Sequence, residues 1–516
     1  MPDRIEHIVV VGGGTAGWMS ACYLQRVLSG ARRRAVKVTV VESDDVGIIG
    51  VGEATIPSIR SVLNLIGVPE WRLLAEADAT FKNAVKFVDW PSVPQDGRSS
   101  HFYHPFDPPP VRDGFNAMSH WLALRDAGLD VPPLDGAVSI QAALCDANLS
   151  PKTFNNRPYE APVPYAYHLD AVKLGRLLRD VALERGVTRI VDHVVGVDRR
   201  EDGDIAALRT RDGRTIAGDF FIDCSGFSAL LIEQTLGARF LDHSDRLLCD
   251  RAVACQTPYD QAESPPRCYT TVTAKTAGWT WDIDLSTRRG TGYVYSSRFI
   301  DDAAAEAELK AHVGLADADF APRLIQARVG RQDRPWIANC LAIGLAAGFI
   351  EPLESTGIHF IELGLGLFVD YIAEGAAAEP LRAHYNKVFA NLYDEVVNFI
   401  MLHYIFNQRR GQPFWDHYRE RVVLPPSLVE QLQLWAYKMP SRTDLRSKIS
   451  IFDGFNYFAI MAGMKTLPPV GANISPFIDL ERSAAFLDEI AATQKRAVAA
   501  SPPHAEMLQK IRSVAG

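Results

Sequence analysis

The residue pattern with the clearest chemical meaning is a glycine motif, G-x-G-x-x-G, between a β-branched run and a helical pattern near the N-terminus. In such a motif the first glycine permits a tight turn, the second lets the backbone approach a pyrophosphate, and the third lets helix and strand pack closely. The N-terminus of the helix adds unpaired N–H groups and the positive end of the helix dipole. The motif therefore predicts a dinucleotide-phosphate site at Gly12, Gly14, Thr15, Ala16 and Gly17.

An acidic residue follows where a dinucleotide site requires one. A second β-branched run, 36–41, ends in Glu42, which is placed to accept hydrogen bonds from ribose hydroxyls. Strand, glycine turn, helix, strand and acid together indicate the opening of a parallel α/β sheet. The alternative is a glycine-rich turn in an ordinary α/β sheet, which explains Glu42 only by chance.

Two later segments favour FAD over NAD as the dinucleotide. Segments 220–226 and 341–348, the latter containing Gly344, each read as an apolar strand followed by a turn of small residues. Flavin hydroxylase-type folds bring such turns back to the cofactor, although each turn alone is typical of simple packing. No second complete G-x-G-x-x-G follows, since Gly364-x-Gly366 lacks the third glycine. Without an NAD(P)H site, the flavin is expected to be reduced by a partner, an NAD(P)H-dependent flavin reductase.

Residues that could do acid–base chemistry occur in pairs, and spacing does not choose between the members of a pair. Lys82 and Lys86 share a face if 81–90 is a strand. Glu351 and Glu354 could both be acids at a helix N-terminus, stabilised by the dipole. Because lysine and glutamate are mostly solvated surface residues, their types alone assign no role.

The elements that must position these residues predict an α/β fold. It combines an FAD-binding, Rossmann-like module of the hydroxylase type with an interleaved antiparallel sheet and a mostly helical C-terminal substrate module. The expected elements are a helix at 170–186, strands at 189–198, 205–210 and 215–223, an antiparallel sheet over 250–300, irregular structure at 91–165 and helices from 357 onward. The expected modules are 1–90, 165–240 and 325–370 for FAD, 91–164 and 241–324 for the substrate-side sheet and loops, and 371–516 for the helical part.

Composition excludes several other classes of protein. The formal net charge is −8 with no long basic block, which argues against a nucleic-acid-binding surface. Seven cysteines form no CxxC pair and no Cys/His cluster with zinc spacing, so reduced thiols and no metal site are expected. No signal peptide and no uninterrupted apolar segment of membrane-spanning length stands out. A cytoplasmic enzyme without a membrane partner is expected, and neither composition nor motifs distinguish a monomer from a homodimer.

Five segments, taken in order, resemble the flavin-dependent tryptophan halogenase family over roughly residues 5–420. They are 12–19 (GGGTAGWM), 50–58 (GVGEATIPS), 81–87 (FKNAVKF), 279–284 (WTWDID) and 349–357 (FIEPLESTG). The resemblance implies an enzyme that uses reduced FAD, O2 and a halide to make hypohalous acid, which then halogenates an aromatic substrate. It also implies flavin contacts at Gly52, Glu53, Ala54 and Ile350, and a halide site at Ser355, Thr356 and Gly357, whose turn is typical of an anion-binding nest.

The resemblance also chooses between the paired candidates. It assigns Lys82 to polarise the hypohalous acid by hydrogen bonding or to carry the halogen as a haloamine. Glu354 would stabilise the positive charge that develops on the attacked ring, or accept its proton. Trp279 and Trp281 would crowd the space near the flavin and discourage direct monooxygenation, although same-face aromatic residues on one strand also have a packing explanation.

Departures from the family pattern affect the substrate. Asp284 replaces the usual proline of the tryptophan motif, which restores a backbone N–H and adds a charge. Segment 441–455 looks shorter than the family's substrate-covering segment and lacks the residues that would hold an amino acid, so tryptophan specificity is not carried over. An indole, a phenol or a carrier-bound compound is expected instead, with His101, Phe102 and Tyr103 as an aromatic wall or as ordinary loop packing.

Two other functions remain as alternatives. An aromatic hydroxylase or epoxidase would transfer oxygen directly to the substrate, and it needs neither Lys82 nor the tryptophan pair. A flavin-binding sensor or scaffold without turnover would need neither Lys82 nor Glu354.

Overall fold

A six-stranded sheet forms the base of the molecule, in a computed structural model that describes residues 4–29, 35–45, 47, 50, 52–258, 264–315, 320–372, 378–447, 449–467 and 475–513. Its strand order is β10-β2-β1-β14-β23-β22. The strands are β1 (His7–Val11), β2 (Lys37–Glu42), β10 (Thr188–Val191), β14 (Phe220–Asp223), β22 (Trp336–Ile337) and β23 (Cys340–Ala342). All neighbours pair in parallel except β22 with β23, and Val9 of β1 pairs with Thr39 and Phe221. The predicted parallel α/β sheet is confirmed.

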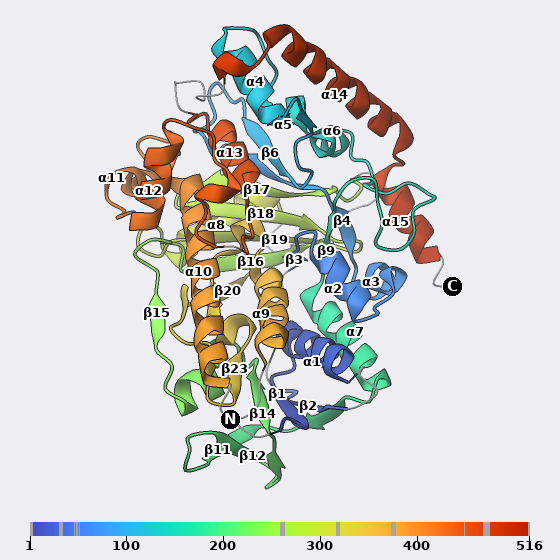
Figure 1. Cartoon of the computed structure of the whole chain (residues 1–516), viewed down its shortest axis with the longest axis vertical. Coiled ribbons are helices and arrows are strands. Elements are labelled where there is room, and N and C mark those ends of the chain that lie inside the picture. The colour runs from blue at the N-terminus through green and yellow to red at the C-terminus, as the bar shows by residue number, and fades with distance from the viewer. Residues whose placement is uncertain are drawn as a thin grey trace.

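The helices at this end carry the turns that face the cofactor region. α1 (Thr15–Leu28) follows β1 directly and packs against α7 (Ala171–Glu184) and α9 (Gly357–Tyr371) (Figure 1). α7 matches the helix predicted over 170–186, and Asp170 caps it by accepting from the N–H groups of Val172 and Lys173.

Two runs that were expected to be single strands are each divided in the structure. The run 189–198 supplies β10 and then β11 (Val194–Arg199), and the run 215–223 supplies β13 (Thr215–Ala217) and then β14. β11 and β13 belong with β12 (Ile205–Thr210) to a separate three-stranded antiparallel sheet. The divisions fall at short polar or glycine-containing segments, 192–193 and 218–219, where the chain leaves one sheet for another.

A second large sheet lies above the first, in the order β20-β16-β19-β18-β17-β5-β6 (Figure 1). It confirms the antiparallel sheet expected over 250–300. Its strands are β5 (Ala84–Val88), β6 (His101–Pro105), β16 (Arg251–Thr257), β17 (Tyr269–Lys275), β18 (Gly278–Asp284), β19 (Arg289–Tyr295) and β20 (Arg323–Gln326). β18, which carries both tryptophans of the motif, lies between β17 and β19 and is buried along its whole length.

Lys82 and Lys86 lie on different strands of different sheets. Lys82 ends β4 (Thr80–Lys82), an outer strand of the three-stranded sheet β3-β9-β4, whose other members are β3 (Glu53–Ala54) and β9 (Ala166–Leu169). Lys86 lies on β5, which pairs with β17 and β6. The chain changes sheets at Asn83, whose N–H donates to the carbonyl of Cys268. A single strand over 81–90 is therefore wrong, and the two lysines face different surroundings.

Residues 91–165 contain more regular structure than expected. Besides β6 and the short pair β7 (Val111–Arg112) and β8 (Phe115–Asn116), they form α4 (Ala117–Asp126), α5 (Leu134–Val138) and α6 (Ile140–Asp146). Side-chain caps start two of these helices, with Asn116 accepting from Ser119 N–H and Ser139 from Ala142 N–H. Their apolar faces pack against the distant helix α14 (Leu480–Ala500), a contact that no local pattern reveals.

The chain beyond 357 is mostly helical, as expected. Its helices include α9, α10 (Ala378–Ile405), α11 (Pro413–Glu420), α12 (Pro426–Trp435), α13 (Gly454–Gly463), α14 and α15 (His504–Ser513). α14 runs over α4 and α6 at the top of the view, and α15 then descends to α3 (Glu70–Glu76) (Figure 1). The end of the chain is thereby returned to the neighbourhood of β4.

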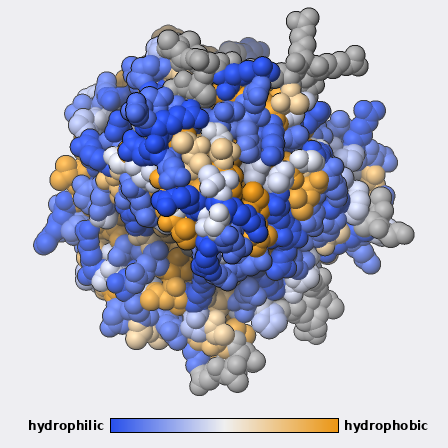
Figure 2. Space-filling view, turned by 90° about the horizontal axis from the view of Figure 1, so that it is seen from below, coloured by the Kyte–Doolittle hydropathy of each residue, from blue (hydrophilic) through white to orange (hydrophobic). Residues whose placement is uncertain are grey.

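The surface seen from below is dominated by hydrophilic residues, with apolar side chains gathered in small groups (Figure 2). Of the helices in the described part of the chain, none combines the length and apolar character needed to cross a bilayer.

Candidate active site

A cavity of about 950 Å³ runs from the β1–α1 turn to the start of α9. It brings together almost all of the predicted cofactor and halide residues. Its lining includes Gly12, Gly14, Thr15, Ala16, Glu42, Gly52, Glu53, Ala54, Trp279, Trp281, Gly344, Ile350, Ser355, Thr356 and Gly357. Gly17 is not part of the lining, and Val51 of the 50–58 motif lies outside the described residues.

The glycine turn at one end of the cavity fits a pyrophosphate. Gly12 has φ +113°, and a Cβ there would lie 2.2 Å from the carbonyl oxygen of Cys224. A Cβ on Gly17 would lie 1.8 Å from the carbonyl oxygen of Gly12, so Gly17 packs the helix closely onto the turn. This packing role is consistent with the absence of Gly17 from the cavity lining. A Cβ on Gly14 would meet no protein atom within 4 Å, so this backbone faces open space that a phosphate can approach closely.

Glu42 lies at the same end, held by two donors. Its Oε1 accepts from Arg189 Nε at 2.5 Å and its Oε2 from Trp18 Nε1 at 3.2 Å, which leaves further lone pairs for ribose hydroxyls. Arg176 and Arg179 of α7 also line the cavity. Sequence reasoning missed Arg176, Arg179 and Arg189. A signal existed for Arg176 and Arg179, because they are spaced i, i+3 on the polar side of a predicted helix.

Two buried polar atoms at the other end have no partner within the described part of the chain. They are Trp281 Nε1 and Thr356 Oγ1, and both residues line the cavity. An unsatisfied buried donor or acceptor costs about 1–3 kcal/mol, so both atoms indicate a ligand that supplies hydrogen bonds. A flavin ring and an anion beside it fit these atoms. Trp279 differs, because its Nε1 donates to Glu351 Oε2 at 3.4 Å.

The structure separates the two glutamates that spacing left equivalent. Glu351 is fully buried beneath the tryptophans, where Tyr404 also donates to it at 2.8 Å, and burial raises its pKa to about 7. Glu354 ends the short 3-10 turn Pro352–Glu354 and interacts electrostatically with Lys82. Ser355, with φ 60°, then turns the chain into α9 and contacts the cavity.

Lys82 is completely buried beside the cavity wall. Its Nζ donates to Ser355 Oγ at 2.8 Å and to the carbonyl oxygen of Thr55 at 3.1 Å. The ring of Phe106 lies 5.3 Å from the same nitrogen. Burial lowers the pKa of Lys82 to about 7, against the opposing effect of the Glu354 carboxylate. The ammonium group is therefore joined to the cavity through the single side chain of Ser355.

Glu354 is held between two histidines. His104 Nδ1 lies 2.9 and 3.0 Å from its two oxygens, and His403 Nε2 lies 2.9 Å from Oε1. Burial raises the pKa of this carboxyl, but His104 and His403 outweigh that effect and lower it to about 2. Glu354 is therefore an anion, and a weak proton acceptor, throughout the working pH range.

Further hydrogen-bond partners hold both rings in place. His403 Nδ1 lies 3.0 Å from the carbonyl oxygen of Phe399. His104 Nε2 lies 2.9 Å from the amide nitrogen of Asn456, whose amide oxygen accepts from the Asp453 N–H. Each ring therefore presents one nitrogen to the Glu354 carboxylate, which can only accept.

The structure divides the predicted aromatic wall between the two faces of β6. His101 is exposed, and Tyr103 points to Asp146, to which its hydroxyl donates at 2.9 Å. Phe102 lies on the opposite face, stacked on Phe87 with ring centroids 5.0 Å apart. Because side chains alternate along a strand, His104 shares that face and reaches Glu354.

Sequence reasoning missed several side chains that contact Lys82, Glu354 or the His104 ring. They are His104, Phe106, Phe399, His403, Phe452 and Phe455. A signal existed for two of them, since His104 and Phe106 lie two residues apart and end a strand-like run. The segment 441–455 contributes Phe452 and Phe455, whose ring centroids lie 6.4 Å from that of His104, while its Lys448 lies outside the described residues.

Asp284, the departure from the tryptophan motif, ends β18 and is fully buried. Arg267 donates to it from Nε at 2.8 Å and from Nη2 at 2.9 Å, and Arg289 donates from Nε at 2.6 Å. Burial alone would raise the pKa of this carboxyl, but the two guanidinium groups hold it well below its usual range. The two tryptophans keep their place on β18, so the substitution leaves the strand intact.

The chain is similar to known proteins over nearly its whole length. A family model described as tryptophan halogenase matches residues 7–477. The tryptophan 6-halogenase SttH of Streptomyces toxytricini is 37% identical over 517 residues, covering 96% of this chain and 95% of that protein. The crystal structure of a tryptophan halogenase from Shewanella frigidimarina has a TM-score of 0.93 at 33% identity, covering 99% and 98% of the two chains. BrvH, a flavin-dependent halogenase from Brevundimonas sp. BAL3, has a TM-score of 0.88 at 36% identity, covering 99% of each.

Proposed function

The chain belongs to the tryptophan halogenase family and is a flavin-dependent enzyme, and on this premise we propose that it halogenates an electron-rich, indole-like aromatic substrate through Lys82. The observation that carries the proposal is the buried ammonium group of Lys82, joined to the cofactor cavity through Ser355 and lying beside the Glu354 anion.

The cofactor would be FAD, held at its phosphates by the Gly12–Gly17 turn and at its ribose by Glu42. When bound in reduced form, it would supply two electrons to O2, and the halide would supply two more as it is oxidised to hypohalous acid, with water as the other product. The reduced form would come from a separate NAD(P)H-dependent flavin reductase, because the chain carries a single complete dinucleotide motif.

The turn of Ser355, Thr356 and Gly357 would hold the halide. Thr356 Oγ1 is buried without a partner among the residues that the structure describes, and the backbone N–H groups at the start of α9 add the positive end of a helix dipole. Bromide is expected to react at least as readily as chloride, because bromide is more easily oxidised. Comparing initial rates in the two salts tests this order.

Lys82 would then activate the hypohalous acid. Two of its three N–H donors are engaged by Ser355 and Thr55, which leaves the third for the oxygen of the oxidised halogen. Glu354 would stabilise the positive charge on the attacked ring and then accept the ring proton, because the ring cation is a far stronger acid than a carboxyl group of pKa about 2. The aromatic rings of His104 and Phe106, on either side of these charges, suit stacking with an indole.

The halogenase function is favoured over direct oxygen transfer. Direct oxygen transfer by a hydroxylase or epoxidase does not require a buried lysine beside the cavity. A flavoprotein without turnover requires neither a buried lysine nor a buried glutamate near it. Two further features are proposed. The chain would form three modules: 1–90, 165–240 and 325–370 for FAD, 91–164 and 241–324 for the substrate-side sheet and loops, and 371–516 for the helical part. It would also form a homodimer, which light scattering of the purified protein tests.

The decisive assay combines the purified protein with FAD, NADH, a flavin reductase, bromide or chloride, and a panel of indoles, phenols and pyrroles. Mass spectrometry distinguishes addition of a halogen from addition of oxygen. Lys82→Ala is expected to abolish halogenation while FAD binding survives. Lys86→Ala is the matched control, because Lys86 is a half-buried lysine in the next strand whose Nζ lies over Tyr103 and Tyr269. Normal halogenation by Lys82→Ala contradicts the proposal.

A further inference from the structure

We propose that His504, near the C-terminus, is a positioning residue that fixes the strand carrying Lys82. This inference rests on the proposed role of Lys82. His504 begins α15 and is 423 positions from the residue that it contacts, so the arrangement is a product of the tertiary fold alone.

The strand that carries Lys82 has little support of its own. β4 is three residues long and lies at the outer edge of its sheet, where it pairs with β9 on one side through Phe81 and Tyr167. On the other side, the N–H of Phe81 donates to Nε2 of His504 at 3.1 Å. The N–H of Asn83 donates to the carbonyl oxygen of Cys268 at 2.7 Å. Two backbone donors, one on each side of Lys82, are thus held by groups from outside the sheet.

The ring of His504 is suited to accept this hydrogen bond. It is completely buried, and its Nδ1 lies 2.8 Å from the carbonyl oxygen of Pro266, which is an acceptor only. Nδ1 therefore carries the proton and Nε2 is free to accept from Phe81 N–H. Burial lowers the pKa of His504 to about 4, against the hydrogen bond to Pro266, so the neutral ring is present at neutral pH.

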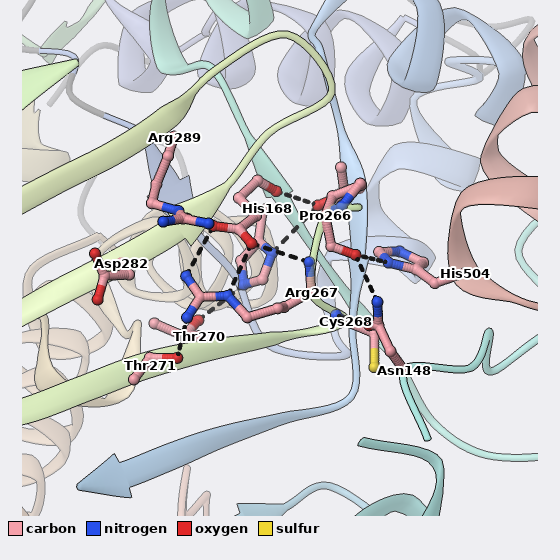
Figure 3. A network of polar contacts seen from close by, with 12 residues as sticks. Asn148, His168, Pro266, Arg267, Cys268, Thr270, Thr271, Asp282, Arg289 and His504 are labelled. Atoms are coloured by element: carbon pink, nitrogen blue, oxygen red, sulfur yellow. Dashed lines mark hydrogen bonds and ion pairs between the residues drawn. The ribbon is translucent and has the colours of Figure 1, made fainter. Parts of the chain in front are cut away.

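Segment 266–268 is in turn anchored to the strand that carries the tryptophan motif. Arg267 contacts Asp284 through its side chain and through its backbone N–H, at 3.0 Å. In Figure 3, His504 points from its helix to Pro266, and Arg267 reaches from the same segment to the side of Arg289. Thr80 of β4 also donates to the backbone carbonyl of Asp284 at 2.6 Å. The residue that departs from the family motif is therefore part of the support of β4.

The consequence for catalysis is geometric. The Lys82 side chain leaves this strand towards Ser355 and Thr55, so a displacement of the backbone at residue 81 moves Nζ away from the cavity wall. A misplacement of about 1 Å in a catalytic group can cost about 10²-fold in rate. Hypohalous acid would still form in the flavin cavity, but less of it would be transferred to the substrate and more would escape into solution.

Two substitutions of similar polarity test this role. H504Q keeps an acceptor near the position of Nε2, whereas H504N keeps a donor near Nδ1 for Pro266 but has no acceptor within reach of Phe81 N–H. The measurement is the halogenated product formed per FADH2 oxidised, together with free hypohalite trapped in solution by a reporter thioether. H504N is expected to lose about tenfold in this ratio, with more hypohalite trapped and FADH2 oxidation unchanged, and H504Q to stay within about threefold of wild type.

Several results overturn the inference. The inference is wrong if soluble H504N gives the wild-type ratio of product to oxidised FADH2. It is also wrong if H504N and H504Q lose this ratio equally, because transfer would then not depend on an acceptor for the Phe81 N–H. Should H504N fail to accumulate, H504Q decides: a loss of tenfold or more in soluble, FAD-binding H504Q refutes the role, and a ratio near wild type supports it. Failure of the proposed function has a different signature, since Lys82→Ala would then halogenate normally whatever the His504 variants do.

Discussion

The charge on Lys82 gives the sharpest test of how the halogen is transferred. Burial lowers the pKa of Lys82 to about 7, so the group changes charge within the working range of the enzyme. A hydrogen-bond donor to hypohalous acid acts as the ammonium ion, whereas a lysine that carries the halogen as a haloamine must first be a neutral amine. The two roles therefore predict opposite pH dependences.

The structure favours the ammonium ion. Both of its hydrogen-bond partners, the Ser355 hydroxyl and the Thr55 carbonyl, accept from Nζ, and the Glu354 carboxylate raises the pKa. With a pKa of about 7, the ammonium form accounts for about 90% of the protein at pH 6 and about 10% at pH 8. We expect halogenated product per FADH2 oxidised to fall about ninefold over this interval.

The assay uses chemically or enzymatically reduced FAD in excess, with product quantified by chromatography and mass spectrometry at half-unit steps of pH. Dividing by FADH2 oxidised removes titrations that act on the cofactor step, such as those of Glu53 and Glu351, whose pKa values burial raises to about 7. Lys82→Arg is the control, because a guanidinium stays charged, so any residual transfer is independent of pH. A product ratio that rises between pH 6 and 8 would refute the donor role and support the haloamine.

Three further predictions concern the cavity and its support. Thr356→Val removes the hydroxyl of a cavity-lining residue that has no partner within the described part of the chain, so the halide KM should rise about fivefold with kcat unchanged, as measured in a bromide titration. Trp281→Phe should weaken FAD binding about fivefold in a fluorescence titration, because the Trp281 indole N–H has no partner among the described residues. Trp279→Phe should not, because the Trp279 N–H donates to Glu351; equal effects would contradict the assignment. Asp284→Asn removes the carboxylate that Arg267 and Arg289 bind and should lower the free energy of unfolding by about 2 kcal/mol, seen as a lower Tm; an unchanged Tm would count against the ion pairs.

The cofactor end of the protein was predictable because its requirements are local. Gly12 needs a positive φ and has no room for a Cβ, and Glu42 ends the next strand, so spacing alone placed both in one turn region. Motif register likewise chose Lys82 over Lys86 and Glu354 over Glu351. Burial separates the two lysines, since Lys82 is buried and Lys86 is half-buried, but it does not separate Glu351 from Glu354, which are both buried.

The surroundings of Glu354 were beyond the reach of sequence reasoning. His104 and His403 lie 299 positions apart, and each reaches the carboxylate from a different element, β6 and α10. The alternation of β6 was visible in the sequence, but which of its faces is turned inward depends on what packs against the sheet. The aromatic wall expected at His101, Phe102 and Tyr103 therefore spans both faces of the strand, and only Phe102 shares a face with His104.

The sequence by itself determined the family, the dinucleotide fold and the residues with reactive side chains, because these depend on residue type and short-range spacing. The tertiary structure alone decided which of these residues meet and in what state of charge. Long-range packing buries Lys82 and so brings its pKa near 7, surrounds Glu354 with two ring donors, and returns His504 from the end of the chain to the strand of Lys82. Burial and partner charges act through space, and a linear pattern does not record them.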